Sequence, residues 1–139
     1  MSENKVDNER VEYPINPPIT NEDLNVLFDA SWPGHKWRDF SPVLAHSLAY
    51  VCAYHEERLI GFVNMAWDGG VHAFILDTTV HPDWRHRGVG QLLVRTAAMA
   101  AREHDIEWLH VDFEPHLRDF YEKCGFQYTD AGLLDLTRH

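Results

Sequence analysis

Apolar residues near the start of the chain recur at intervals of three and four, which is the spacing of one helix face. The residues on this face are Leu24, Leu27 and Phe28. Thr20 precedes them as a candidate N-cap, with Asp23 three residues later as an approximate capping box. We therefore expect a helix that ends before the Trp-Pro-Gly sequence at residues 32–34. A short strand is expected at residues 11–15, and Ser-Pro at residues 41–42 predicts a second short helix to about residue 48.

From residue 49 onward the pattern changes to that of strands. Residues 49–54 and 59–66 predict a hairpin, and the Asp-Gly-Gly turn at residues 68–70 leads into a third strand at residues 71–80. This third run is mostly apolar and β-branched, so we expect a central strand that is covered on both faces.

The second half of the chain predicts two more helices and further strands. A helix over residues 91–104 is expected to bury one face, made of Leu92, Leu93, Thr96, Ala97 and Ala100. A strand is expected at residues 108–113. A helix is expected from Pro115 to about Lys123, with Gly125 as its terminator. Residues 126–129 and 133–137 predict a closing hairpin. Together these elements predict an α+β domain with a mixed, mostly antiparallel central sheet flanked by helices.

Composition narrows the class of protein. Hydrophobic residues make up 45% of the 139 positions, which excludes a disordered chain, and no apolar run approaches the ~20 residues of a membrane span. With 22 acidic and 12 basic residues the net charge is −10, which excludes a general nucleic-acid binder. We expect residues 1–10 to be a flexible lead-in and residues 11–139 to be one domain. The start lacks the apolar core of a signal peptide, and Cys52 and Cys124 lack metal-site spacing, so a cytoplasmic protein with free thiols is expected.

The candidate chemistry lies at the joint between the third strand and the long helix, where residues 80–91 read VHPDWRHRGVGQ. Gly88 and Gly90 allow a tight turn directly before the helix, so unpaired N–H groups and the positive end of the helix dipole meet there. Arg85, His86 and Arg87 add donors. The spacing fits neither a P-loop nor a dinucleotide-binding fold, but it predicts a phosphate site.

Two segments carry a resemblance to a known family. Val80, Pro82, Arg85, Gly88 and Gly90 match V-x-P-x-x-[QR]-x-x-G-x-[GA], the acyl-CoA-binding motif of the GNAT superfamily of N-acetyltransferases. Residues 120–126, FYEKCGF, resemble the family segment [FL]-Y-E-K-x-G-F. The two motifs stand in the family's order, and the resemblance extends over about residues 11–137.

The resemblance implies a GNAT-like sheet whose central strands splay apart, with acyl-CoA held between residues 71–80 and 108–113. Backbone groups of Thr79 and Val80 would pair with pantetheine, and the Val80 amide would polarise the thioester carbonyl. Tyr121 would act as general acid for the departing thiolate. The pyrophosphate would be held by Arg85, His86, Arg87, Gly88, Val89, Gly90 and Gln91.

The general base and the acceptor site stay open, because Phe74 stands where some members of the family carry a glutamate and Glu114 where many carry asparagine. A base matters because a lysine-like amine is ~0.1% neutral near neutral pH, a cost of ~4 kcal/mol. The candidate bases are His72, Asp77 and Asp112, each of which has a structural role as its alternative. Trp32 and Trp37 are candidates for a wall of the acceptor pocket or for caps of the core, and Trp84 for the adenine or the surface.

The sequence therefore predicts transfer of an acetyl or other acyl group from acetyl-CoA to an amine acceptor by direct attack in a ternary complex. The expected partners are a small-molecule or peptide amine and a second copy of the chain in a homodimer, with neither nucleic acid nor membrane. No metal is expected, because the histidine pairs complete no plausible set of ligands. Two alternatives remain, a non-catalytic CoA-binding module and a protein that binds another phosphate ligand.

Overall fold

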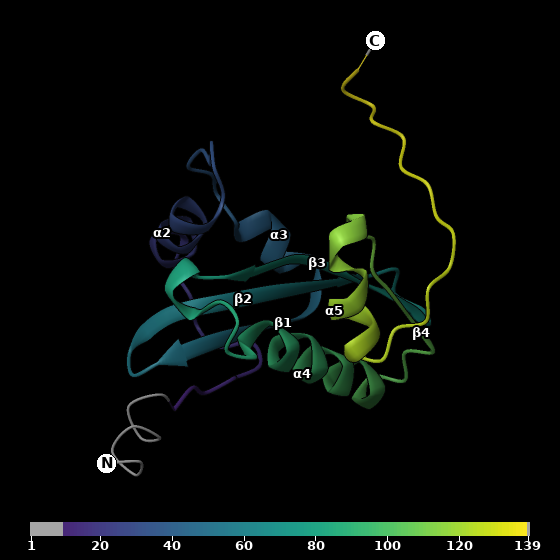
Figure 1. The fold of residues 1–139 in the computed structure, drawn as a ribbon, viewed down its shortest axis with the longest axis horizontal. Helices are drawn as coiled ribbons and strands as arrows, with labels where there is room; N and C mark the ends of the chain where they lie inside the picture. Colours follow the sequence, from purple (N-terminus) through teal and green to yellow (C-terminus); the bar gives the residue numbers. More distant parts are fainter. Residues whose placement is uncertain (1–9, 139) are drawn as a thin grey trace.

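The computed structural model describes residues 10–138, so most of the lead-in expected at residues 1–10 lies outside the described residues. Its centre is a four-stranded sheet in the order β1-β2-β3-β4. The strands are β1 (Ser47–His55), β2 (Arg58–Trp67), β3 (His72–Val80) and β4 (Trp108–His110). The first three are antiparallel neighbours and β4 runs parallel to β3 (Figure 1). The α+β class and the mostly antiparallel sheet are confirmed.

Helices cover the two faces of the sheet, because successive strand residues point to opposite sides. On one face, α4 (Val89–Glu103) packs against Val51, Val63 and their neighbours. On the other, α2 (Asn21–Ser31) packs against Cys52 and Phe62. Figure 1 shows α2 and α3 (Ser41–Ala45) across the sheet from α4.

The first helix forms as the sequence predicts. Thr20 accepts a hydrogen bond from the Asp23 N–H at 3.1 Å, and the apolar face is buried. The helix ends at Ser31, directly before Trp32. Two neighbouring predictions were too long: α3 ends at Ala45 because Ser47 already pairs with β2, and residues 11–15 form only isolated bridges to β1.

The long helix is confirmed, but its buried face is not quite the predicted one. Leu92 is 47% exposed, while Val89, Val94 and Ala101 are buried with the other apolar positions. The face is therefore rotated towards a stripe that contains several alanines, which allows close approach to the sheet. A Cβ on Gly61 of β2 would lie 2.9 Å from Leu93 Cδ1, so this contact requires glycine.

Strand β3 is not covered on both faces, contrary to the prediction. Phe74 and Leu76 are 38% and 39% exposed, and buried and exposed residues alternate along the first half of the strand. The reason is that α2 meets β3 near its far end, where Trp32 bonds to Thr79, while α3 lies against β1. This leaves the start of β3 open on that side.

Strands β3 and β4 splay apart after a short parallel contact, as the family resemblance implies. Their register pairs residues 72–74 with residues 108–110, and β4 ends at His110 instead of the expected residue 113. On its other side β3 contains an irregularity in its pairing with β2, between Phe62 and Asn64. Asp77 lies opposite this irregularity with a φ of 57°, a conformation that few residues other than glycine adopt.

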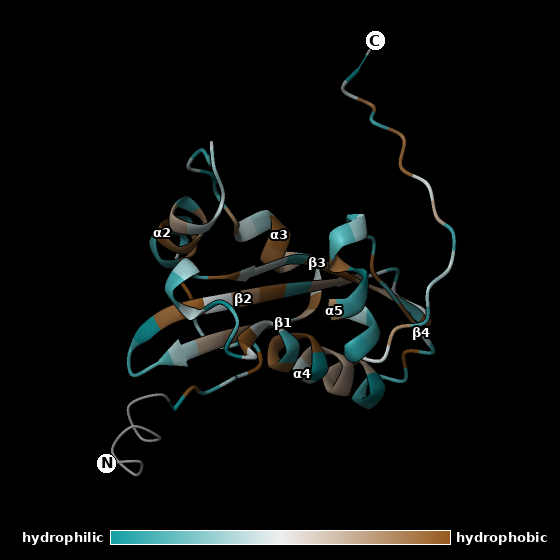
Figure 2. Cartoon of the chain, viewed as in Figure 1, coloured by the Kyte–Doolittle hydropathy of each residue, from teal (hydrophilic) through white to brown (hydrophobic). Residues whose placement is uncertain are grey.

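The end of the chain corrects the prediction of a closing hairpin. Pro115 begins a single 3₁₀ turn, η2 (Pro115–Leu117), followed by α5 (Arg118–Lys123). Gly125, directly after the C-cap Cys124, has a φ of 101° and terminates the helix as predicted. Residues 126–138 then form no strand, and Figure 1 shows them leaving the body of the molecule. Leu133, Leu134 and Leu136 are 85%, 82% and 84% exposed. Figure 2 shows apolar stretches along this segment, away from the rest of the molecule. The sequence predicted two strands around Ala131 and Gly132, but a local pattern does not supply the partner that a strand needs.

Candidate functional site

The splay exposes one edge of β3. The His81 N–H donates to the Ile60 carbonyl of β2 at 2.8 Å, and Gly61 pairs with Val80 in the antiparallel register. Because backbone groups of an antiparallel strand alternate in direction, those of Val80 point away from β2 and into the gap. By the same alternation the backbone of Thr79 faces β2. The Val80 N–H is therefore an available donor beside the gap.

The start of α4 lies at the end of this edge. Gly88 is the helix N-cap with a φ of 83°, and the first intrahelical bond runs from the Leu92 N–H to the Gly88 carbonyl at 3.1 Å. The N–H groups of Val89, Gly90 and Gln91 precede that bond, so the helix leaves them without intrahelical acceptors. A Cβ on Gly90 would lie 3.2 Å from the Phe120 ring, which explains why this turn needs glycine. A helix N-terminus of this kind suits an anion, which is the ligand that the sequence predicts here.

Of the side chains at residues 85–87, Arg85 links two parts of the fold and Arg87 lines a cavity beside the turn. Arg85 donates to the Val80 carbonyl at 3.3 Å and to the Ser31 carbonyl at 3.1 Å, so it joins β3 to the end of α2. The Arg87 guanidinium lies 4.7 Å from the Trp84 ring. His86, between them, is exposed with a φ of 64°.

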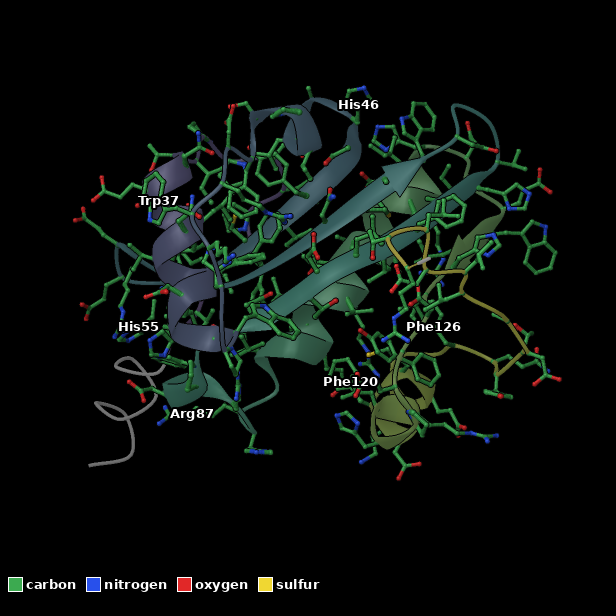
Figure 3. The ribbon with its side chains drawn as sticks, turned by 90° about the horizontal axis from the view of Figure 1, so that it is seen from above. Trp37, His46, His55, Arg87, Phe120 and Phe126 are labelled. Carbon is green, nitrogen blue, oxygen red and sulfur yellow. The ribbon has the colours of Figure 1, made fainter. Side chains whose placement is uncertain are left out.

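A cavity of about 600 Å³ opens beside the turn. Its walls are Val11, Tyr13, Trp84, Arg87, Val89 and Leu92. Trp84 is mostly buried, with His55 on one side and Arg87 on the other, both labelled in Figure 3. It belongs to the core as well as to this cavity, so the surface position that the sequence left open for it is excluded.

Tyr121 reaches the splay from α5. Its side chain is 6% exposed, is stacked on Phe113 at 5.0 Å between centroids, and donates a long hydrogen bond to Thr78 Oγ1 at 3.5 Å. Burial raises the pKa of the Tyr121 phenol, with smaller contributions from Cys124 and Asp112, against a lowering by Thr78. The phenol is thus protonated at neutral pH and lies beside β3 where the strand departs from β4.

On the opposite side of β3 from Tyr121, the carboxylate of Asp77 faces the guanidinium of Arg38. Asp77 Oδ2 lies 3.9 Å from Arg38, whose backbone N–H and carbonyl both bond to the buried side chain of Asn25. Trp32 Nε1 donates to Thr79 Oγ1 at 3.0 Å, which ties the same loop to β3. Sequence reasoning missed Arg38, Asn25 and Thr78, because no motif marks them.

The other predicted residues lie at different distances from the splay. Asp112 is exposed just beyond β4 and contributes to the raised pKa of Tyr121, so it lies near the gap. His72 instead begins β3, where its Nδ1 lies 2.8 Å from His110 Nε2. Trp37 is exposed beside α2, at the other end of the view in Figure 3 from Phe120 and Phe126. Across residues 10–138, no group of three or more His, Cys, Asp or Glu side chains is arranged to hold a metal ion.

A sheet with splayed central strands, a glycine turn at a helix N-terminus and a tyrosine at the gap together define an acyl-CoA transferase fold. The family model described as "Acetyltransferase (GNAT) family" matches residues 16–126. The chain belongs to this family.

Curated relatives are named N-acetyltransferases. The uncharacterized N-acetyltransferase ycf52 of Gracilaria tenuistipitata var. liui is 26% identical over 117 residues, which cover 81% of this chain and 64% of that protein. The ycf52 protein of Pyropia yezoensis is 32% identical over 69 residues, 50% of this chain and 40% of that protein. The chain thus spans less than two thirds of the length of these relatives.

Solved structures show the same fold. A putative acetyltransferase of Deinococcus radiodurans R1 superposes with a TM-score of 0.78 at 24% identity, covering 92% of this chain and 90% of that chain. The aminoglycoside N-acetyltransferase AAC(6')-Iy in complex with CoA superposes with a TM-score of 0.74 at 20% identity, covering 94% of this chain and 96% of that chain. Within residues 10–138, no helix has the length and apolar character needed to cross a membrane.

Proposed function

We propose that this protein transfers an acetyl group from acetyl-CoA to an amine acceptor by direct attack in a ternary complex. The observation that carries the proposal is the Tyr121 hydroxyl, 3.5 Å from Thr78 Oγ1 at the edge where β3 leaves β4. An acid is needed there, because the acceptor nitrogen bonds to the thioester carbon, the carbon–sulfur bond breaks, and the sulfur leaves with the electron pair. Tyr121 gives its proton to that sulfur.

The residues present fit acyl-CoA. The N–H groups of Val89, Gly90 and Gln91 would hold the pyrophosphate, and the cavity between Tyr13 and Arg87 would take the nucleotide end. The Val80 N–H, directed into the gap, would bond to the pantetheine arm or to the thioester carbonyl. Arg85 supports this cradle from behind, because its guanidinium is already bound to two backbone carbonyls.

The acceptor would approach from the opposite face of β3. Asp77 and Thr78 are consecutive, yet Asp77 faces Arg38 in the loop after α2 while Thr78 faces Tyr121 on α5. A direct transfer requires a group that accepts the proton of the amine and a group that donates a proton to the sulfur. The Asp77 carboxylate and the Tyr121 phenol, on opposite faces of β3, are such groups. We assign to Asp77 the binding of the acceptor ammonium and the uptake of its proton. Asp112 and His72 stay predictions for that role, and His72 lies five residues from Asp77 along the strand.

The proposal also covers the acceptor, the oligomeric state and the cellular location of the protein. A small-molecule or peptide amine would lie against Trp32, with Trp37 further out on the same loop. Residues 133–136 expose three leucines, which supports a homodimer through this segment. The free thiols Cys52 and Cys124 support a cytoplasmic location.

A non-catalytic CoA-binding module is the second candidate, favoured by Phe74 at the position where some members of the family carry a glutamate base. Initial rates over a grid of acetyl-CoA and amine concentrations test both candidates. A sequential pattern, with intersecting double-reciprocal lines, is the expected result. Parallel lines would contradict the ternary complex, and binding of CoA without turnover of any amine would favour the module.

A further inference from the structure

Arg38 and Asp77 form an ion pair on the acceptor side of β3. The distance from the Arg38 guanidinium to Asp77 Oδ2 is 3.9 Å, and the two side chains are 49% and 41% exposed. This is the only charged partner of Asp77 that we find among residues 10–138. An exposed pair at this separation contributes about 0–1 kcal/mol, so a ligand can separate it at little cost.

The cation is held in place by the fold. Asn25, fully buried on α2, bonds to both backbone groups of Arg38, at 2.9 and 3.0 Å, and its Oδ1 lies 2.9 Å from the ring nitrogen of His35. The Arg38 guanidinium also lies 4.5 Å from the centroid of the Phe40 ring. Arg38 is therefore a fixed positive charge beside Asp77.

This arrangement selects against a simple amine. An ammonium that approaches Asp77 meets the Arg38 charge beside it, and it gains only one ion pair while it breaks another. A ligand with adjacent positive and negative groups replaces both partners at once, with its ammonium on Asp77 and its anionic group on Arg38. The planar guanidinium binds a carboxylate through two parallel hydrogen bonds, so a carboxylate suits the arginine.

We propose that the acceptor carries a carboxylate next to its amine, as an α-amino acid does, and that Arg38 is the residue that recognises it. The inference rests on the proposed function, since it concerns the acceptor of that reaction. In an α-amino acid both groups are attached to one carbon, so the two charges lie close enough to meet two side chains that are themselves in contact. Trp32, half-exposed and tied to Thr79 on the same loop, is placed to contact the rest of the acceptor.

The test uses matched pairs that differ only in the carboxylate. Phenylalanine and phenethylamine, leucine and isoamylamine, and lysine and cadaverine are each assayed for CoA release and for acetylated product. Wild type is expected to show kcat/KM at least about tenfold higher for the amino acid of a pair it accepts, the effect of a charge-assisted hydrogen bond. Arg38→Gln is expected to remove this preference from both sides: kcat/KM falls for the amino acid, which loses its carboxylate partner, and rises for the plain amine, which no longer meets the arginine charge beside Asp77.

A matched control uses Arg118, an exposed arginine paired with Glu122 on α5. Arg118→Gln is expected to keep the preference. Equal or faster turnover of the plain amines by wild type overturns the inference and leaves the proposed transfer standing. A preference that survives in Arg38→Gln also overturns it.

A binding measurement distinguishes failure of the recognition by Arg38 from failure of the proposed acetyl transfer. Thermal unfolding with saturating CoA and each compound measures acceptor affinity without turnover. A shift with the amino acid of a pair and not with its amine supports the recognition by Arg38, even where no product forms, and the absence of product then counts against the transfer alone. Equal shifts within every pair overturn the inference.

Discussion

Replacing Tyr121 with phenylalanine separates catalysis from folding. The ring stacks on Phe113 at 5.0 Å and meets Phe120 and Phe126 edge-on, and phenylalanine preserves all of these contacts. The hydroxyl makes one long bond, 3.5 Å to Thr78. Loss of a single neutral hydrogen bond costs ~0.5–1.5 kcal/mol, and this length places it at the low end. The free energy of unfolding should therefore fall by less than ~1 kcal/mol.

The effect on turnover should be much larger. Loss of a general acid lowers kcat by ~10²–10⁴-fold, which is ~2.7–5.4 kcal/mol of barrier. Affinity for CoA should change little, because the backbone groups of Val80 and of the α4 N-terminus are untouched. Since burial raises the pKa of this phenol, wild-type kcat should also persist to higher pH than an unperturbed tyrosine allows and then fall as Tyr121 ionises.

The assay measures CoA release under saturating acetyl-CoA and amine, with urea unfolding and CoA titration on the same samples. Tyr128→Phe is the matched control, since that tyrosine is half-exposed and bonds Asp130 beyond α5. It should retain kcat. If folded Tyr121→Phe keeps kcat within twofold of wild type, the assignment of Tyr121 as general acid is refuted.

Four further outcomes are expected. Gly90→Ala should weaken CoA binding and lower stability by ~1–3 kcal/mol, because its Cβ would lie 3.2 Å from the Phe120 ring, whereas Gly132→Ala, with open space around it, should do neither in CoA titration and urea unfolding. Asp77→Asn should lower kcat/KM by ~10²-fold or more in the amine assay, and an unchanged value would remove Asp77 from the mechanism. Cys52, whose pKa burial raises to about 12, should react with iodoacetamide only after unfolding, which mass spectrometry of the intact and unfolded protein checks. Replacing Leu133, Leu134 and Leu136 with serine should convert a dimer to a monomer in sedimentation velocity, while a wild-type monomer would contradict the homodimer.

Elements whose start or end is set by neighbouring residues could be predicted from the sequence alone. The cap at Thr20 and the proline that begins η2 act within one turn, so they predict helix starts without knowledge of the rest of the fold. The turn before α4 is equally local at Gly88, because its φ of 83° favours glycine whatever surrounds it, whereas the need for glycine at position 90 comes from the distant Phe120 ring.

Features that depend on distant partners could not be predicted in this way. The Arg38–Asp77 pair joins the loop after α2 to β3, and neither residue lies in a motif. Residues 133–137 were predicted as a strand, yet a strand needs a neighbour that the sequence pattern does not name. Leu92, predicted as buried beside Leu93, is exposed because α4 approaches β2 through Leu93 and Gly61, a contact between segments more than thirty residues apart.

Thermal unfolding in the presence of acetyl-CoA, CoA, ATP and NAD, each at matched concentration, tests the central claim most directly. A ligand at 100 times its Kd stabilises the folded protein by about 2.7 kcal/mol. For a chain of 139 residues that corresponds to a rise in Tm of roughly 9 °C. We predict this shift with acetyl-CoA and CoA and a much smaller one with ATP or NAD. A folded protein that shows no shift with either CoA species would contradict the account and leave the turn at residues 85–90 as a site for another anion.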